Sequence, residues 1–289
     1  MKFIKSTFIM KQLSIQFHLM AFRIGAVSLG CAFVVFSACA ADPAPPVMSA
    51  ADLASQLSAF QQDGASYVRL RLEVKQLPGT TKTTLQLQIK QRRTKTATNV
   101  VYQVLWPKER KGESVLLQKE ANQPATGSLF VPPGTMRPLD NSQMKQPLFG
   151  SDLSYEDVLE NFFAWEHQTL AGTEVVGGVS CQILESKPGK NEHSSYASVR
   201  TWVDPRRMVP LRIEKYLASG QRALRIDSTK VATDDTHRTI AANLTVRGQK
   251  QDSVSELDGS SIRHDVTYTD REFTPEGIRK LTPPASAPK

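Results

Sequence analysis

The sequence predicts a mainly β protein organised around one long antiparallel sheet. Most of the chain after residue 65 alternates apolar and polar side chains with a period of two, which is typical of strands with one buried and one wet face. Tight turns rich in glycine, proline and aspartate separate these segments, and such short connections favour antiparallel neighbours. Because helical periods are rare in the same region, we expect the sheet to form the core of the fold.

We expect about eleven strands, in two groups separated by a stretch with a helical period. The first group covers 67–77, 85–90, 98–106, 113–120 and 127–132. The second group covers 168–176, 179–187, 196–204, 208–217, 221–231, 236–248 and 261–270. A flat sheet of this size would expose an apolar face, so the sheet must curl. If it closes tightly, side chains fill its interior; if it stays open, the apolar interior can hold a ligand beneath the helices.

Two helices are predicted at the start and at the end of this sheet region. The first covers 49–60, because Ser49 is a suitable N-cap and apolar residues recur on one stripe at Leu53, Leu57 and Phe60. A short final helix is expected after Thr274, with proline at its first position.

A third helix is predicted at 154–165, between the two groups of strands. Ser154 is its expected N-cap, and Asp157 occupies the capping-box position three residues later. The apolar side chains follow the i, i+3, i+4, i+7 spacing of an amphipathic helix: Tyr155, Val158, Leu159 and Phe162, with Phe163 and Trp165 beside them. We therefore expect this aromatic face to cover the sheet, or to hold a ligand against it.

The first 40 residues are predicted to be an export signal. Four basic residues precede the first acid at Asp42, a short apolar run covers 24–36, and 38–40 form a small-x-small cleavage pattern. A lipoprotein signal that is lipidated at Cys39 is the alternative, and the start of translation is left open between Met1, Met10 and Met20. We expect a periplasmic protein, or one anchored through Cys39, with a single domain at 41–289 whose leader 41–48 and tail 283–289 are disordered.

Composition excludes some classes of function. Removal of the four basic residues of the signal lowers the formal net charge from +8 to +4, which allows transient contact with a membrane surface but is too small for a nucleic-acid-binding protein. After residue 40 a single cysteine, Cys181, remains. It alternates with polar neighbours as a buried strand residue does, and it has no partner for an internal disulfide.

No sequence motif predicts a cofactor, and the histidines lack the spacing of metal ligands. The acidic residues Asp152, Glu156 and Asp157 lie near aromatic residues, which permits acid–base chemistry. Capping and interaction with the helix dipole are the favoured interpretation of these acids. We therefore predict no catalytic residue, no metal and no cofactor.

One segment resembles a known family. Residues 148–157 are similar to the "GSDFSYEDL" signature of the outer-membrane lipoprotein-sorting protein family, with Leu153 where the signature has phenylalanine. The matching positions are Gly150, Ser151, Asp152, Ser154, Tyr155, Glu156 and Asp157. Two further pieces, 170–185 and 202–220, follow in the family's order, so the resemblance covers roughly 65–275.

The resemblance implies a LolA/LolB-like unclosed antiparallel β-barrel in which a few helices cover an apolar cavity. It also implies binding of lipid or lipoprotein acyl chains in the periplasm, in some members beside RND-type exporters. The candidate lid and cavity residues are our inference: Leu57, Phe60, Val158, Leu159, Phe162, Phe163, Trp106 and Trp202. We expect a monomeric carrier.

Two other functions fit the same scaffold. One is a lipid-active hydrolase that uses Ser151 or Ser154 together with Asp152, Asp157 and a histidine brought near by folding. The other is an accessory subunit of an envelope exporter, whose groove engages a protein segment.

Overall fold

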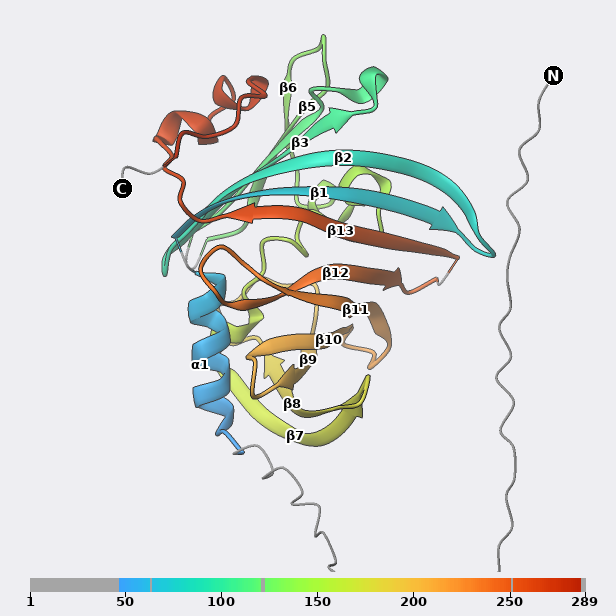
Figure 1. The fold of residues 1–289 in the computed structure, drawn as a ribbon, viewed down its shortest axis with the longest axis vertical. Helices are drawn as coiled ribbons and strands as arrows, with labels where there is room; N and C mark the ends of the chain where they lie inside the picture. The colour runs from blue at the N-terminus through green and yellow to red at the C-terminus, as the bar shows by residue number, and fades with distance from the viewer. Residues whose placement is uncertain (1–46, 63, 121–122, 251, 287–289) are drawn as a thin grey trace, which may run out of the picture. The chain divides into compact units, whose positions relative to one another are not determined.

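A computed structural model describes residues 47–62, 64–120, 123–250 and 252–286, which lie within one compact unit (Figure 1). The predicted export signal, Cys39 and most of the predicted leader lie outside the described residues. In this part of the chain the single α-helix is α1 (Ala50–Gln61), close to the predicted range. Its N-cap is Ser49, whose side chain accepts a hydrogen bond from the backbone N–H of Asp52, as predicted.

Thirteen strands of the described residues form one antiparallel sheet. The first six are β1 (Gly64–Gln76), β2 (Thr80–Arg93), β3 (Ala97–Trp106), β4 (Ser114–Glu120), β5 (Thr126–Phe130) and β6 (Met136–Leu139). The other seven are β7 (His167–Val176), β8 (Val179–Lys187), β9 (Ser198–Asp204), β10 (Val209–Tyr216), β11 (Arg222–Thr233), β12 (Thr239–Gly248) and β13 (Ser253–Arg263).

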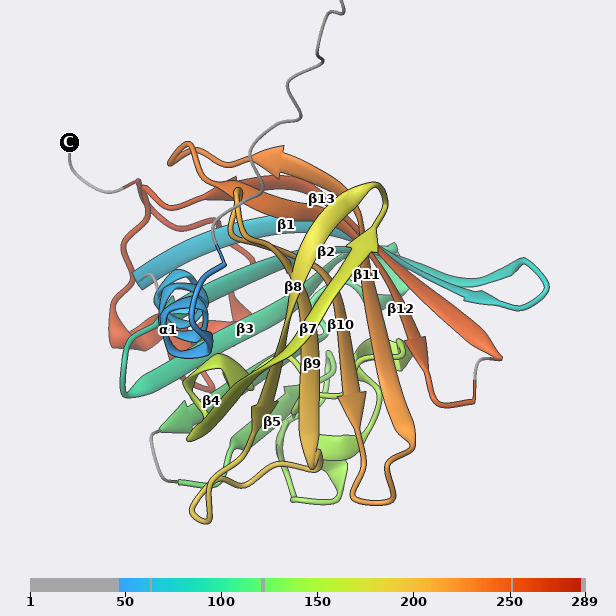
Figure 2. The same cartoon turned by 90° about the horizontal axis from the view of Figure 1, so that it is seen from below.

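Each group of strands runs up and down, and the pairing of β1 with β13 joins the two groups. The order across the sheet therefore starts at β6 and ends at β7. Figures 1 and 2 show the sheet curving between these two edges, with α1 near one end of the strands. The chain crosses from one edge to the other within this curve, through residues 140–166. The predicted mainly β, antiparallel and unclosed fold is confirmed.

The predicted strand at 261–270 is wrong, because β13 occupies 253–263. Asp258 and Gly259 suggested a turn, yet both lie inside the strand. A side chain at Gly259 would meet the carbonyl oxygen of Ala242 at 2.8 Å, and the register with β1 shifts opposite this position. The glycine therefore allows close approach of two strands at a bulge rather than a chain reversal.

The predicted helix at 154–165 does not form. Ser154 and Asp157 do make the predicted reciprocal bonds, but only the 3₁₀ turn η4 (Phe162–Ala164) follows. The carbonyl of Val158, which an α-helix would pair with the N–H of residue 162, instead accepts a hydrogen bond of 2.7 Å from Arg93 of β2. Distant residues thus override a local helical pattern.

The predicted final helix is replaced by two 3₁₀ turns, η5 (Asp270–Phe273) and η6 (Gly277–Arg279). They belong to an outer segment, residues 270–281, which covers the convex side of β2–β4. Phe273 and Ile278 pack there against Val101 and Leu116. The outer segment is why side chains such as Gln88, predicted to lie on a wet strand face, are buried.

Candidate functional site

The candidate site lies on the concave, inner face of the sheet, beneath residues 144–165, which we call the crossing segment. Five of its buried side chains pack with the apolar residues of β1–β4: Met144, Leu148, Phe149, Tyr155 and Leu159. Leu153 packs with Leu224 and Val246 of the opposite strands. Its last residues join α1 and β8–β9 in a further apolar cluster. The crossing segment therefore covers most of the inner face.

Asp152 fixes the first half of the crossing segment to β13. Its carboxylate accepts hydrogen bonds from the hydroxyls of Ser253 (2.7 Å) and Ser255 (2.6 Å). Its backbone N–H donates to the Ser255 hydroxyl oxygen at 2.8 Å. The strand residues are close in sequence but lie about a hundred positions from Asp152, so this clamp is a long-range one.

A buried ion cluster fixes the second half to β10. The ammonium of Lys215 lies 2.8 Å from Asp157 Oδ1 and 2.9 Å from Glu160 Oε2, and only 2% of its side chain is exposed. The hydroxyl of Tyr196 donates to Asp157 at 2.9 Å, and that of Ser194 donates to Glu160. The ammonium also lies 4.7 Å from the centre of the Tyr196 ring.

The two carboxylates of this cluster differ electrostatically. Burial would raise the pKa of Asp157, but the charge of Lys215 and the hydrogen bonds from Ser154 hold it below its usual range. Burial raises the pKa of Glu160 and outweighs Lys215, with a further contribution from the charge of Asp157. Burial would lower the pKa of Lys215, but the two carboxylates raise it. The cluster therefore holds a charged lysine and a firmly ionised aspartate, with a glutamate that protonates more easily.

A pocket of about 580 Å³ opens at the edge of the crossing segment. Its wall combines apolar residues, Met144, Leu159 and Trp165, with charged ones of both signs, among them Lys95, Lys119, Glu156 and Glu160. This volume is within the range of small-molecule sites, about 300–1,000 Å³. Three of its lining residues carry a buried polar atom without a hydrogen-bond partner in the described structure: Gln61 Oε1, Asn161 Oδ1 and Ser195 Oγ.

The predicted lid and cavity residues divide into two groups. Leu57, Leu159, Phe162 and Phe163 are buried and Val158 is half-buried, all in the inner clusters. Of the whole predicted set, Leu159 alone lines the pocket. These positions are contributed by turns, except for Leu57 on α1.

Three predicted cavity residues do not line the inner face. Phe60 is 45% exposed at the end of α1, and Trp106 is 50% exposed at the end of β3. Trp202 is buried, but it alternates with Val203, which packs on the inner side, so its side chain lies on the outer side. There its indole donates to Glu174 at 2.8 Å, and Arg212 lies over its ring.

Sequence reasoning missed the partners of the acidic residues. Arg93, Tyr196 and Lys215 are far from the crossing segment in sequence, and none belongs to a motif. One signal was present: Lys215 continues the alternation of Ile213 along β10, so a lysine occupies a position that should be apolar. Such a lysine predicts a buried carboxylate partner.

The serines of the crossing segment are engaged in local hydrogen bonds. The Ser154 hydroxyl donates to Asp157 at 2.7 Å, and the buried Ser151 hydroxyl bonds the backbone of Leu153. No hydrogen bond joins either serine to a histidine in the part of the chain that the structure describes. The arrangement thus gives no specific support to the hydrolase hypothesis.

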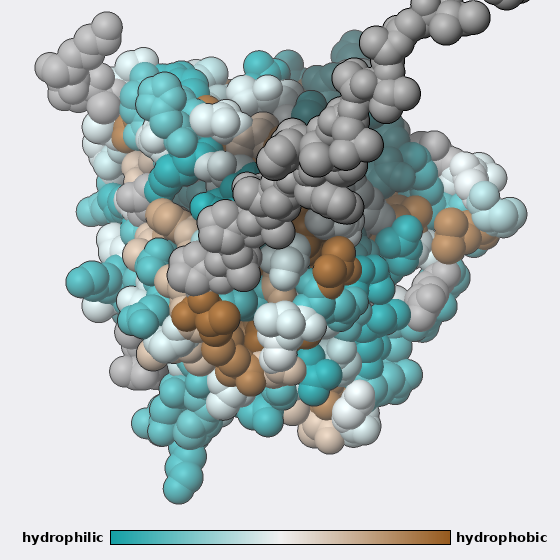
Figure 3. All heavy atoms as spheres, turned by 60° about the horizontal axis from the view of Figure 1, so that its bottom comes forward, coloured by the Kyte–Doolittle hydropathy of each residue, from teal (hydrophilic) through white to brown (hydrophobic). Residues whose placement is uncertain are grey.

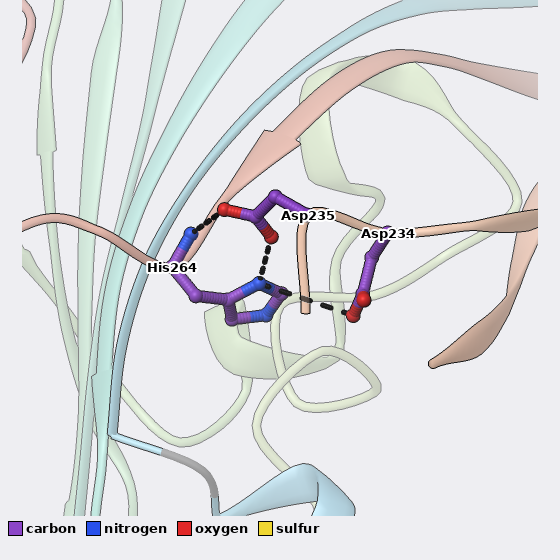
Figure 4. Close-up of side chains that lie close together, drawn as sticks. All are labelled: Asp234, Asp235 and His264. Atoms are coloured by element: carbon purple, nitrogen blue, oxygen red, sulfur yellow. Dashed lines mark hydrogen bonds and ion pairs between the residues drawn. The ribbon is translucent and has the colours of Figure 1, made fainter. Parts of the chain in front are cut away.

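Within the described ranges one group of side chains has the proximity required of metal ligands: Asp234, Asp235 and His264 (Figure 4). Asp235 Oδ1 lies 2.5 Å from His264 Nδ1, and Arg238 donates to Nε2 of the same ring at 3.2 Å. A guanidinium can only donate and a carboxylate can only accept, so Nε2 is the acceptor and Nδ1 carries the proton. Arg238 also lies 3.4 Å from the second carboxylate, that of Asp234.

A cation at this group would have to replace the Nδ1 proton and approach a guanidinium. The geometry is therefore that of a hydrogen-bonded network, which ties the β11–β12 turn to the end of β13. Arg238 extends the network to α1, since its guanidinium lies 5.8 Å from the centre of the Phe60 ring.

On the face drawn in Figure 3, apolar side chains form small separate groups among polar ones, apart from what the grey atoms cover. None of the helices in the described residues has both the length and the apolar character needed to cross a membrane. On the inner face of the sheet, by contrast, apolar side chains of the strands and of the crossing segment form one buried cluster.

Comparison with known proteins identifies the family. A family model described as "Uncharacterized protein"-like matches residues 96–280. The search of curated proteins returns no match. Among solved structures, a DUF1329 family protein from Desulfovibrio piger is 21% identical with a TM-score of 0.71; the match covers 78% of this chain and 95% of that chain.

Two further structures share the fold. A domain from Vibrio parahaemolyticus, named for outer membrane lipoprotein sorting, is 17% identical with a TM-score of 0.71, and the match covers 80% of this chain and 98% of that chain. A LolA superfamily protein from Nitrosomonas europaea is 17% identical with a TM-score of 0.63, with 79% and 98% covered. These identities show the fold alone, which is LolA-like, as predicted. The family model matches residues 96–280, more than half of the chain, so the chain belongs to the family that this model describes.

Proposed function

We propose that this protein binds an acyl chain of a lipid or lipoprotein in the cell envelope and carries it through the periplasm. The observation that carries the proposal is the apolar inner face of an unclosed sheet, with a pocket of about 580 Å³ at its edge. The LolA-like fold, and structural relatives named for lipoprotein sorting, support it.

The energetics of an acyl chain fit such a site. Burial of hydrocarbon contributes about 0.8 kcal/mol per CH₂, so a chain of ~14 methylenes gains on the order of 11 kcal/mol when it leaves water. The inner face supplies aliphatic side chains from at least four strands, among them Leu72, Leu85, Val104 and Leu117. The pocket wall and the anchors of the crossing segment supply polar groups beside this apolar face, which suits a ligand with an apolar tail and a polar head.

The proposed carrier is exported, acts as a monomer and touches membrane surfaces transiently. The predicted signal and the small positive charge of residues 41–289 support this part of the proposal. An RND-type exporter or another envelope transporter is the proposed donor or acceptor, by analogy with the resembled family.

Lipid extraction tests the proposal. The protein is purified, extracted with organic solvent and analysed by lipid mass spectrometry, and uptake of a fluorescent fatty acid is measured in parallel. We expect a co-purifying acyl lipid and saturable uptake. Protein that is consistently free of lipid and takes up no fatty acid would contradict the proposal.

A pair of variants gives this test a matched control. Leu117→Ala removes part of the apolar inner face and should weaken uptake several-fold. Leu116→Ala removes a similarly buried leucine on the other side of β4 and should lower stability without changing affinity. Equal effects of the two variants on affinity would place the ligand somewhere other than the inner face.

A further inference from the structure

We propose that the polar end of the ligand is anionic, a carboxylate or a phosphate, and that Arg93 binds it in the pocket at the edge of the crossing segment. This inference rests on the proposed function, because it names the chemical class of amphiphile that the same site takes. Fatty acids and phospholipids belong to this class, whereas acylglycerols with a neutral head do not.

Arg93 lies at the end of β2, where the inner face meets the pocket. It continues the alternation of Leu87 and Ile89, so its side chain belongs to the inner side of the strand. The same side chain lines the pocket together with the apolar Leu159 and Trp165. A cationic group beside an apolar wall suits a ligand that has a charged head and a hydrocarbon tail.

The guanidinium of Arg93 has no acidic partner in the part of the chain that the structure describes. It donates one hydrogen bond, of 2.7 Å, to the carbonyl of Val158. Every other arginine of the described ranges that is not exposed pairs with a carboxylate, as Arg92 does with Asp270. Arg93 is the exception, and it lines a pocket instead of contacting an acid.

An anion in the pocket would compensate the burial of this charge. Burial lowers the pKa of Arg93, and the residue that opposes this effect is Tyr102 rather than a carboxylate. A guanidinium presents several N–H donors in a planar fork, which matches two oxygens of a carboxylate or a phosphate. Val158 accepts from one of these donors, so the others can bind an oxyanion.

The remaining charged side chains of the pocket favour the same sign of ligand. Lys95 and Lys145 line the pocket and form no ion pair with the described residues. Four acidic residues also line it, but three of them already have a donor within the protein: Glu156, Glu160 and Glu192. The fourth acid is exposed. Cations without a partner therefore outnumber acids without one.

Displacement of an uncharged fluorescent probe, N-phenylnaphthylamine, tests the inference with ligands of one chain length. Palmitate and palmitoyl lysophosphatidate supply the two anionic heads, and monopalmitoylglycerol and hexadecanol are the neutral controls. We expect at least one anionic ligand to displace the probe at a concentration roughly tenfold or more below that of the neutral ligands, because hydrogen bonds to charged groups are the stronger ones. The more potent of the two anionic ligands distinguishes a carboxylate head from a phosphate head.

Two other outcomes are separable. If the anionic ligands displace the probe no better than the neutral ones, the anionic head is wrong and the carrier function stands. If none of these ligands binds, the proposed function itself is contradicted.

Arg93→Gln and Arg92→Gln form a matched pair, because the two arginines are adjacent on β2 and Arg92 binds Asp270 on the outer side. Arg93→Gln should abolish the preference for the anionic ligand, and Arg92→Gln should leave it unchanged. Arg93→Lys retains the charge without the fork and should keep part of the preference.

The preference is the ratio of two affinities measured in the same variant, so a loss of stability that affects both ligands cancels. If Arg93→Gln weakens anionic and neutral ligands equally, Arg93 acts only through its bond to Val158, and its assignment as the binding residue is overturned.

Discussion

Two irregular segments cover the two faces of the same sheet, and they are attached by different chemistry. The outer segment is held mainly by neutral groups: Gln103 donates to the Ile278 carbonyl at 2.5 Å, and Gln88 donates to the Leu281 carbonyl at 3.0 Å. The crossing segment on the inner face is held by carboxylates, through Asp152 and through the pairs with Lys215.

Because of this difference, the two covers should respond differently to pH and to the loss of one partner. Neutral amide–carbonyl bonds do not respond to pH in this range. Ionic anchors are more sensitive, because protonation or loss of one partner changes the free energy of the whole cluster. The following predictions test whether the two covers really differ in this way.

The largest effect is expected for Lys215→Met. The substitution leaves Asp157 and Glu160 buried without a counter-ion, so the free energy of unfolding should fall by about 3–5 kcal/mol. Chemical denaturation measures the change.

The matched control for this variant neutralises the whole cluster. In Lys215→Met/Asp157→Asn/Glu160→Gln no unpaired charge remains, and most of the lost stability should return. If the triple variant is as unstable as the single one, packing of the lysine stem rather than charge determines the effect.

The corresponding change on the outer face is Gln103→Leu. It leaves the carbonyls of Ile278 and Lys280 without this donor, so we expect a loss of about 1–3 kcal/mol in the free energy of unfolding. Fatty-acid uptake and exchange of the crossing segment should be unchanged, because the outer segment does not contact the inner face. An effect on uptake would show that the two covers are coupled.

Acid titration should affect the crossing segment in two phases. The pKa of Glu160 is raised above its ordinary 4.5 by burial, so the folded state binds this proton more readily than the unfolded state does. Protection from exchange should therefore increase as pH falls from neutral through this raised pKa. The pKa of Asp157 is held below its ordinary 3.8, so protection should be lost at still lower pH, as Asp157 is protonated.

Hydrogen–deuterium exchange measures this profile. The exchange rates of the crossing segment are corrected for the intrinsic pH dependence of exchange and compared with those of the outer segment. Glu160→Gln should abolish the first phase and keep the second. If exchange of the wild-type crossing segment became steadily faster as the pH falls from neutral, this result would contradict the assignment of the raised pKa to Glu160.

The strands were predictable because the alternation of apolar and polar residues within each strand indicates which side is buried. In β1 the apolar Val68, Leu70, Leu72 and Val74 all pack on the inner side, as their alternation with charged residues predicts. For β2, the prediction of a solvent-exposed outer face was wrong. Gln88 is buried there by the outer segment, which lies almost two hundred positions further along the chain.

The site was less predictable, because long-range contacts decide it. The spacing of the apolar residues from Tyr155 to Phe162 fits a helix. The backbone forms turns instead, because Arg93 binds the Val158 carbonyl and Lys215 pairs with Asp157. The acidic residues were interpreted as helix capping for the same reason. Only the capping bond between Ser154 and Asp157 is local, and it is the part of that prediction which the structure confirms.

The smallest effect is expected where the outer segment does carry a charge. Asp270 pairs with Arg92 at 2.6 Å, but Asp270 is 91% exposed, so water and salt screen the interaction. Asp270→Asn should change the free energy of unfolding by less than about 1 kcal/mol. Arg92→Ala should cost more, because Arg92 also lies 5.1 Å from the centre of the Phe273 ring and covers it. If Asp270→Asn instead loosened the outer segment as much as Gln103→Leu, both covers would depend on charge, and the contrast between a neutral and an ionic attachment would be lost.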